Sequence, residues 1–202
     1  MCVSYNNIKL SDFDMYANGK KVIPYIGKGK IGYSDYNFIA YVFNSLGKQE
    51  VKIIFNKTLV NMKNLFYGCY DLISIEFNEA FDTSHVLCMY YMFGRCESLQ
   101  HINISSFNTS LVGDMEGMFD QCNSLTSLDL SNFDTKNVDY MQCIFANSKK
   151  LSYLDISSFD LTYLAGAACM FDGLAENGTV IINNKFNRQS SLPKGWKIIK
   201  KN

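Results

Sequence analysis

The sequence predicts an α/β repeat fold, a right-handed solenoid with a parallel sheet on its concave face and short helices opposite, preceded by a strand-rich cap. Three observations predict it: a short internal repeat, two different apolar spacings within each repeat, and the composition of a chain that packs a core. Hydrophobic residues make up 48% of the 202 residues, and there are only 13 Gly and 2 Pro, which excludes disordered and collagen-like classes. This length suits one domain or a short repeat array.

Residues 1–58 are predicted to form the N-terminal cap. Apolar, aromatic-rich runs at 22–26, 37–43 and 50–55 are separated by turn residues, which is typical of strands. Residues 1–19 are polar with scattered aromatics, and we expect them to be irregular. Such a cap would cover the open end of the first repeat.

Residues 59–173 are predicted to form the repeats. A Met-x-x-Met-Phe pattern ends on a phenylalanine that recurs at a constant interval, apart from one extra residue in the first interval: Phe66, Phe93, Phe119, Phe145 and Phe171. Three positions after each comes one of a second row, namely Cys69, Cys96, Cys122 and Ser148. A period of about 26 residues indicates stacked repeats.

Each repeat combines a strand pattern with a helix pattern. Leu128 and Leu130 alternate with polar residues, as in a half-buried strand, whereas Val138, Met141 and Ile144 recur at the spacing of one helix face. A repeat of this size cannot bury both faces alone, so neighbours must share one core. Strand and helix on opposite sides predict a solenoid of the leucine-rich-repeat type.

Residues 174–202 are predicted to form a C-terminal cap and a basic tail. The run TVIINN reads as a last strand, and Trp196 and a finish containing Lys197, Lys200 and Lys201 follow it.

The segment 115–160, with its order Met-Phe-x-x-Cys-x-Ser-Leu-x-x-Leu-x-Leu, resembles the repeat of the BspA-like leucine-rich-repeat proteins. The resemblance extends over about residues 59–173. It implies an adhesin-like surface protein that binds a host or cell-surface protein, and it implies no enzymatic activity. The chain differs from that family in showing neither a secretion signal nor a surface anchor.

Charge, cysteines and apolar runs indicate the setting. Lys and Arg together number 19 and so do Asp and Glu, so we expect no nucleic-acid partner. No signal peptide or membrane-spanning stretch is visible, so the sequence as it stands predicts a cytoplasmic chain, whereas the resemblance suggests the cell surface. Seven cysteines are an odd count outside a disulfide-rich scaffold, which favours free thiols.

Candidate catalytic and metal chemistry is sparse. Gly27, Gly29 and Gly32 match the letters of a dinucleotide fingerprint, but Pro24 and the β-prone run after them favour a hairpin. The Cys row places thiols side by side, which suits neither a disulfide nor a tetrahedral metal site. His85 and His101 lie in different parts of the repeat from those thiols. We therefore expect no enzyme, cofactor or metal, and an enzyme with a nucleotide site at Gly27–Gly32 is the least favoured alternative.

The outward positions of the predicted sheet are the candidate binding site. Polar and acidic side chains alternate there with the buried apolar ones. The residues are Glu76, His101, Asn103, Ser127, Asp129, Tyr153 and Asp155. The sequence predicts a non-enzymatic protein-interaction module that binds a protein partner through this face. Two other interpretations stay open: these positions are polar only for solubility, or the chain is a structural, self-assembling repeat protein.

Overall fold

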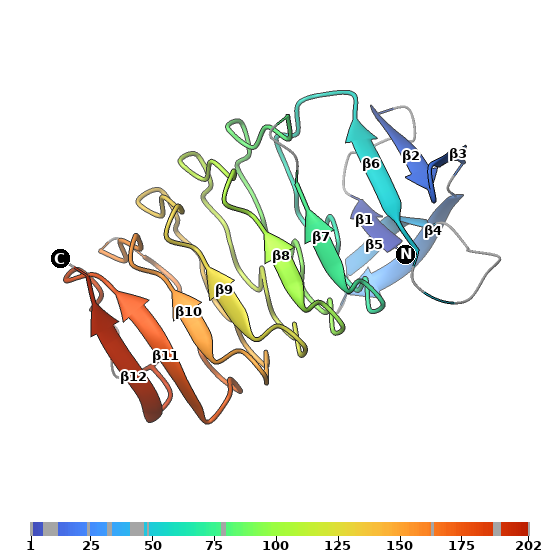
Figure 1. The fold of residues 1–202 in the computed structure, drawn as a ribbon. Helices are drawn as coiled ribbons and strands as arrows, with labels where there is room; N and C mark the ends of the chain where they lie inside the picture. The colour runs from blue at the N-terminus through green and yellow to red at the C-terminus, as the bar shows by residue number, and fades with distance from the viewer. Residues whose placement is uncertain are drawn as a thin grey trace.

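The fold is built from strands and turns. The computed structural model describes residues 2–5, 12–23, 25–31, 34–40, 47, 49–77, 80–162, 164–187 and 191–201. The described strands are β1 (Cys2–Tyr5), β2 (Phe13–Ala17), β3 (Lys20–Val22), β4 (Tyr25–Ile31), β5 (Ser34–Ala40), β6 (Val51–Phe55), β7 (Ser74–Glu76), β8 (His101–Asn103), β9 (Ser127–Asp129), β10 (Tyr153–Asp155), β11 (Asn177–Ile182) and β12 (Gly195–Lys200). Figure 1 shows the later strands side by side along the molecule.

The N-terminal part consists of two antiparallel sheets of three strands, in the orders β1-β5-β4 and β3-β2-β6. Phe13, Met15 and Ala17 alternate with half-buried residues along β2, and all three are buried. The expectation that residues 1–19 are irregular was wrong where β1 and β2 form, and in β2 the period-two pattern buries Phe13 and Met15 in the core of the repeats.

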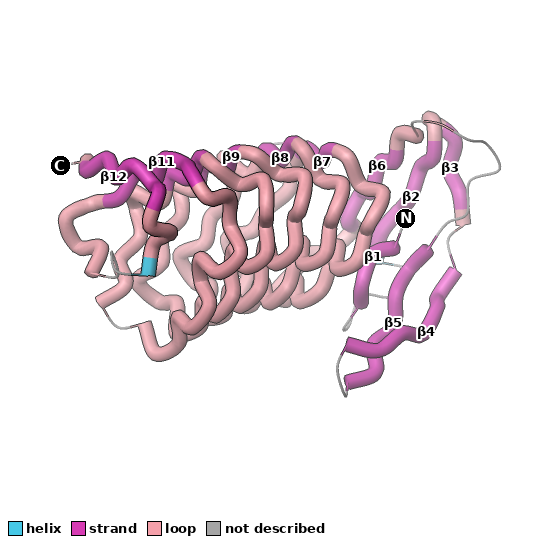
Figure 2. Tube along the Cα trace, turned by 90° about the horizontal axis from the view of Figure 1, so that it is seen from below, coloured by secondary structure: helices cyan, strands magenta, loops and turns pink. Residues whose placement is uncertain are grey.

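The repeats place parallel strands next to one another. Ser74 pairs with His101 and Glu76 with Asn103 between β7 and β8, and Ser127 pairs with Tyr153 between β9 and β10. The strands nevertheless form two sheets, β7-β8 and β9-β10-β11-β12, because no pairing joins β8 to β9 among the described residues. Figure 2 shows the repeats stacked in succession beside the N-terminal sheets.

The short helices expected opposite the sheet are absent, and the α/β class is corrected to a strand-based fold. Within the described ranges no residue is α-helical. In residues 62–68 the even-numbered amides donate to carbonyls of the next repeat at 2.8–2.9 Å, whereas the amides of residues 65, 67 and 69 donate three residues back at 3.1 Å. Every backbone donor in this segment is therefore satisfied without a helix.

Left-handed backbone conformations explain why the helix does not form. One position of each repeat has positive φ, at Asn64, Tyr91, Gly117, Cys143 and Cys169. A second position of each repeat also has positive φ, at Gly68, Arg95, Gln121, Asn147 and Gly173. A right-handed helix cannot continue through such residues. The Met spacing instead arises from consecutive tight turns that point their apolar side chains inward.

The core is a set of rows that run through the repeats. The phenylalanines of the Met-Phe pattern stack face to face, with ring centroids 5.5 Å apart for Phe66 and Phe93 and 5.6 Å for Phe93 and Phe119. Cys96 and Cys122 are fully buried and donate their thiols to the carbonyls of Phe66 and Phe93. Ser148 makes the equivalent bond to Phe119 at 2.7 Å, which explains how serine can replace cysteine in this row.

A row of buried threonines joins the repeats at a second place. The Thr109 hydroxyl donates to the carbonyl of Asp134 at 3.0 Å and accepts its amide at 2.8 Å. Thr83 and Thr135 make the same pair of bonds to Asn108 and Asp160. Each hydroxyl thus satisfies two backbone groups of the following repeat.

Two cysteines that were expected to be free thiols form a disulfide. Cys143 and Cys169 are 26 residues apart, and their Cα atoms lie 4.7 Å apart. They occupy the same position in adjacent repeats, and both have positive φ, so their side chains meet across the gap between repeats. Cys69, Cys96 and Cys122 are not disulfide-bonded, in agreement with the expectation for the Cys row, and neither is Cys88.

The C-terminal residues extend the parallel sheet. β11 follows the predicted last strand, but residues 195–200, expected to be a basic tail, form β12, which pairs with β11 over its whole length. Trp196 is buried and donates its indole N–H to the carbonyl of Ala175. In the part of the chain that the structure describes, no helix is long and apolar enough to cross a membrane.

Candidate functional site

The predicted site residues lie at the two ends of each short strand on one side of the repeats. Glu76, His101, Asn103 and Asp129 are exposed, while the central residue of each strand points inward. The strand register brings Glu76 next to Asn103. Among the described residues no backbone pairing joins β8 to β9, so the strand register relates the seven predicted residues only within two groups, one on β7 and β8 and one on β9 and β10.

Three of these side chains also stabilise the backbone. Asn103, Asp129 and Asp155 each accept the amide two residues further on, at 3.2, 2.9 and 3.0 Å. Such Asx turns end the strand and redirect the chain. Polar residues at this row are therefore explained in part by local structure.

Asp155 does not belong to the exposed surface. Its side chain is only 5% exposed, and Lys201 Nζ lies 2.7 Å from its Oδ2. Burial acts to raise the pKa of Asp155, but hydrogen bonds from Lys201 and Ser157 outweigh it, so the pKa lies below its usual value. Asp155 is therefore not exposed as expected, because β11, β12 and Lys201 extend beyond it and cover it.

The remaining candidates form a row at the start of the strands. Tyr153 is 41% exposed and pairs through its backbone with Ser127 on one side and Thr179 on the other. His101 holds the same repeat position in β8. This row offers an aromatic ring, an imidazole and a hydroxyl to a partner.

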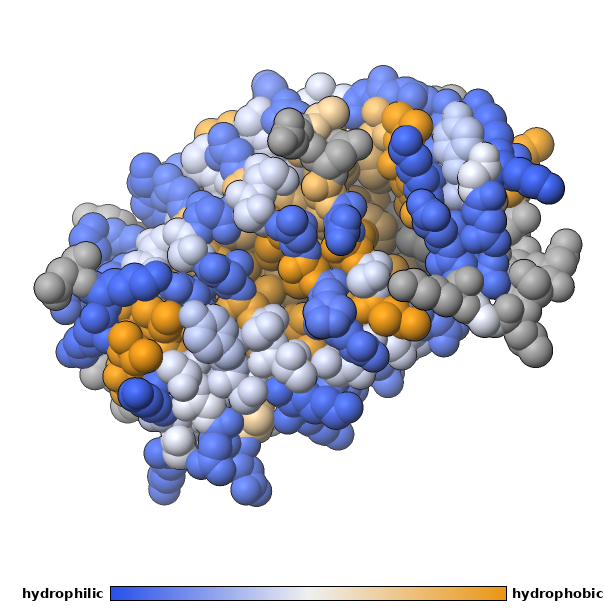
Figure 3. Space-filling model, in the orientation of Figure 1, coloured by the Kyte–Doolittle hydropathy of each residue, from blue (hydrophilic) through white to orange (hydrophobic). Residues whose placement is uncertain are grey.

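Sequence reasoning missed an apolar surface next to these residues. Ile75 and Ile102, the central residues of β7 and β8, pack against the core but are only half-buried, although Leu128 and Leu154 of the same row are 3% and 0% exposed. Figure 3 shows this side of the molecule with an apolar hollow in its middle and hydrophilic residues around it.

Two phenylalanines of the first repeat are open to this side as well. Phe77 and Phe81 are half-buried. The residues that follow them in the same rows are buried: Ile104, Leu130 and Ile156 after Phe77, and Phe107, Phe133 and Phe159 after Phe81. We call Ile75, Phe77, Phe81 and Ile102 the apolar hollow.

A groove continues the apolar hollow toward β6. It has a volume of about 390 Å³ and runs between residues 53–59 and residues 80–82. The rings of Phe55 and Phe81 lie against each other there, tilted by 53° and with centroids 5.7 Å apart. The sequence held one signal of this opening: the first interval between repeats is longer than the others by a single residue, which falls between Phe77 and Phe81.

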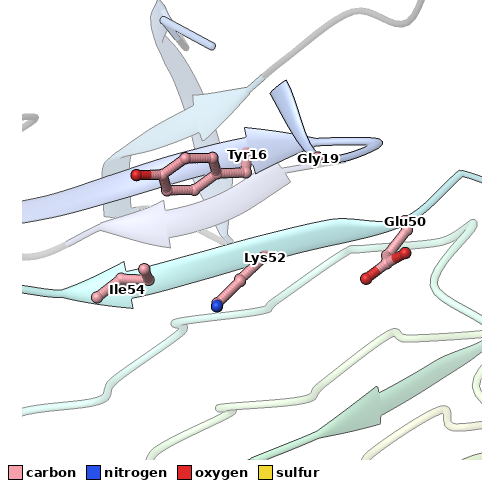
Figure 4. A pocket seen from close by; sticks show the side chains of 5 residues that line it. All are labelled: Tyr16, Gly19, Glu50, Lys52 and Ile54. Carbon is pink, nitrogen blue, oxygen red and sulfur yellow. The ribbon is translucent and has the colours of Figure 1, made fainter. Parts of the chain in front are cut away.

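A second depression lies on the outer face of the β3-β2-β6 sheet. It has a volume of about 360 Å³ and is lined by Tyr16, Gly19, Glu50, Lys52 and Ile54. Figure 4 shows that it is formed by alternate residues of the β6 segment and by β2, with one carboxylate and one ammonium group. This arrangement brings no set of catalytic groups together.

Metal and nucleotide chemistry find no support in the described residues. These residues contain no group of three or more His, Cys, Asp or Glu side chains that could hold a metal ion. Burial raises the pKa of the Cys122 thiol far above its usual value. Gly27 and Gly29 lie within β4, paired antiparallel with β5, and not at the strand-to-helix turn that binds a dinucleotide. Gly32 lies outside the described residues.

The fold and this surface define a strand-based repeat protein whose strand side carries half-buried apolar residues. The chain belongs to the family described as "Mycoplasma protein of unknown function, DUF285", whose model matches residues 56–184. The resemblance to BspA-like leucine-rich-repeat proteins was therefore wrong as an assignment of family, and the adhesion it implied loses its basis. No curated protein and no solved structure matches this chain.

Proposed function

We propose that the repeats form a curved solenoid of the leucine-rich-repeat type that binds a protein partner through its strand side. Parallel strands in register, a shared core and a nearly constant repeat length support this architecture. The role is that of a non-enzymatic interaction module.

The apolar hollow is the observation that carries the proposal. The rows of Phe77 and Phe81 are buried in every later repeat but half-buried in the first, and the row of Ile75 is half-buried in the first two repeats and buried from Leu128 on. Leaving a large apolar side chain partly exposed forgoes up to about 1 kcal/mol relative to full burial. Clustered apolar side chains that are open to solvent and surrounded by polar residues are typical of a protein-binding surface.

Polar residues of the neighbouring strands form the rim of the proposed interface. His101 and Asn103 lie on β8, on either side of Ile102 in sequence, and are exposed. Asp129 and Tyr153 follow on β9 and β10. An apolar and aromatic centre within a polar rim is the usual anatomy of a protein interface. The expected partner therefore inserts apolar side chains into the apolar hollow and forms hydrogen bonds with this rim.

Affinity measurements on an identified partner test the proposal. The intact chain serves as bait, the captured protein is purified, and its affinity is measured by biolayer interferometry for the wild type and for Ile102→Gln. We expect the variant to weaken binding about tenfold or more, because a polar group would replace a central apolar contact. Leu111→Gln is the matched control, since Leu111 is 50% exposed but lies outside the apolar hollow.

The rim is tested without disturbing the fold. Asp129→Asn keeps the oxygen that accepts the Ser131 amide and removes only the charge. Together with Tyr153→Ala it should weaken binding severalfold, whereas circular dichroism should show unchanged folding. If Ile102→Gln and the rim variants all bind as tightly as the wild type, the partner uses another surface.

The alternative of a self-assembling repeat protein has its own measurement. Light scattering over a range of protein concentrations would show a rise in mass if copies associate. A rise that Ile102→Gln abolishes would assign the apolar hollow to contact between copies, which contradicts the proposed binding of a different protein.

A further inference from the structure

The last strand of the parallel sheet has an open edge. Among the described strands, β12 pairs only with β11. The Lys201 amide donates to the carbonyl of Ile182 of β11, so by alternation along the strand the N–H and C=O groups of Ile198 and Lys200 point away from β11. These four backbone groups are available to an added strand.

An apolar row that is buried in the earlier strands becomes exposed at β12. Ile198 is in register with Val180, and this row continues through Leu154 to Leu128. The three earlier members are 0–3% exposed, but Ile198 is 40% exposed and its neighbour Ile199 is 37% exposed. Figure 3 shows an apolar patch at the end of the molecule where β11 and β12 lie. One more strand would bury both side chains.

Positive charge surrounds this edge. Residues 191–201 contain four lysines and no Asp or Glu. Lys201 pairs with Asp155, whereas within the described part of the chain no carboxylate forms a salt bridge with Lys194, Lys197 or Lys200. A second copy of the same edge is disfavoured, because it would bring two lysine-rich edges together, and antiparallel pairing centred on Ile199 would place Lys197 opposite Lys201.

We propose that β12 is a docking edge for an extended acidic segment of a partner protein, which adds to the sheet as a further strand. The order Lys-Ile-Ile-Lys over residues 197–200 selects a partner with two apolar residues flanked by acidic ones. Because this order reads the same in both directions, a parallel or an antiparallel strand would satisfy it. Main-chain hydrogen bonds supply affinity and the side-chain pairs supply specificity. This surface is distinct from the apolar hollow and does not depend on the function proposed for it.

Tryptophan fluorescence can measure peptide binding at β12 directly. Trp196 is the only tryptophan and lies in β12, where it is 7% exposed. The probe is a capped peptide, Thr-Glu-Val-Val-Glu-Thr, titrated into the full 202-residue chain at low salt. We expect a saturable change in Trp196 emission that weakens as salt is added, because exposed ion pairs are screened.

Two control peptides separate strand addition from plain charge attraction. A peptide with lysine in place of each glutamate should not bind. A peptide with the same side chains but N-methylated backbone amides should bind at least about tenfold more weakly, since it cannot form the strand hydrogen bonds. Equal binding of the methylated peptide would overturn strand addition.

Protein variants locate the site. Lys197→Glu combined with Lys200→Glu should weaken binding of the probe about tenfold, as two charge pairs are reversed. The matched control is Lys149→Glu with Lys150→Glu, which changes charge equally at two exposed lysines outside β12. Equal affinities of the two double variants, or no fluorescence change with any peptide up to millimolar concentration, would refute the proposal. A mass of two chains by light scattering that the Lys197 and Lys200 variant alters would assign the edge to a second copy instead.

Discussion

The turn side and the strand side of the repeats are held together differently. On the turn side, parallel bridges run without interruption from Asn61 through Cys88, Asp114 and Tyr140 to Gly166. On the strand side, the sheet is divided between β8 and β9. The rows of Phe, Cys and Thr continue past this division.

This difference indicates which side carries stability and which is free to carry binding. The division is tolerated because the turn side pairs its backbone groups between repeats and buries its Met and Phe rows in every repeat. The strand side can then leave Ile75, Phe77 and Ile102 half-buried. Variants on the two sides should therefore differ in their effect on the free energy of unfolding.

The largest effect is expected in the Phe row. Phe119 is fully buried and stacks on Phe93 and Phe145. Phe119→Ala should lower the free energy of unfolding by about 3–5 kcal/mol, measured by urea denaturation. Phe119→Leu should cost much less, and Ser127→Ala on the strand side should change stability by less than about 0.5 kcal/mol. Comparable losses for Phe119→Ala and Ser127→Ala would contradict the comparison.

The disulfide is expected to contribute the next largest effect. Cys143 and Cys169 close a loop between adjacent repeats with a sequence separation of 26 residues. Reduction, or the double change of both residues to serine, should lower the free energy of unfolding by about 3 kcal/mol. Cys88→Ser is the control because Cys88 is a free thiol. A stability that does not respond to reductant would argue against this cross-link.

The threonine row should show a smaller loss. Thr109→Val removes the hydroxyl that serves both the amide and the carbonyl of Asp134. Two backbone groups lose their partner, so we expect a loss of about 2 kcal/mol in thermal or urea denaturation. Thr109→Ser keeps the hydroxyl and should retain most of the stability. If Thr109→Val and Thr109→Ser lower the free energy of unfolding equally, the threonine row contributes to stability through packing alone.

The smallest effect concerns pH. Hydrogen bonds from Thr162 and Lys185 lower the pKa of Asp160 to about 2 from its usual 3.8. Because the folded pKa is the lower one, the stabilising contribution is complete above about pH 4 and is lost as the pH falls through about 2. Lys185→Met should therefore reduce the fall in melting temperature between these pH values. An identical fall in the melting temperature of wild type and variant would show that the Asp160–Lys185 pair adds nothing to stability.

Several features of the fold followed from the sequence. The rows of Phe119 and Phe145, the buried Cys row and the inward positions of Leu128 and Leu154 were predicted from the period of the repeat, and the structure confirms them. They were predictable because side chains at the same place in stacked repeats must face the same surroundings.

The helix was the main error, and its cause is specific. Apolar residues at steps of three and four also result from successive tight turns, so the spacing does not distinguish the two structures. Gly68, Gly117 and Gly173 were the available signal, because all three lie in the left-handed region of φ. At Gly117 an added Cβ would also overlap the ring of Tyr91, which packs over that glycine.

The candidate site was predicted only in part. Exposed residues such as Asp129 and Tyr153 followed from alternation along a strand. The burial of Asp155 did not follow from the sequence. It depends on Lys201, which is 46 residues away and is brought to Asp155 by the pairing of β12. The apolar hollow could not be predicted from the sequence either, because Leu128 and Leu154, in the same row as Ile75, are buried.

The sequence by itself determined the repeat, its period and the rows that form the core, since these depend on residues at constant spacing. Only the tertiary structure decided how the backbone groups of the turn side are paired, that Cys143 meets Cys169, and where rows of equivalent residues become open to solvent. The physical reason is that burial and pairing depend on the neighbouring repeat. At the first repeat, at the division between β8 and β9 and at β12, the neighbouring strand that the repeat would supply is missing or displaced among the described residues.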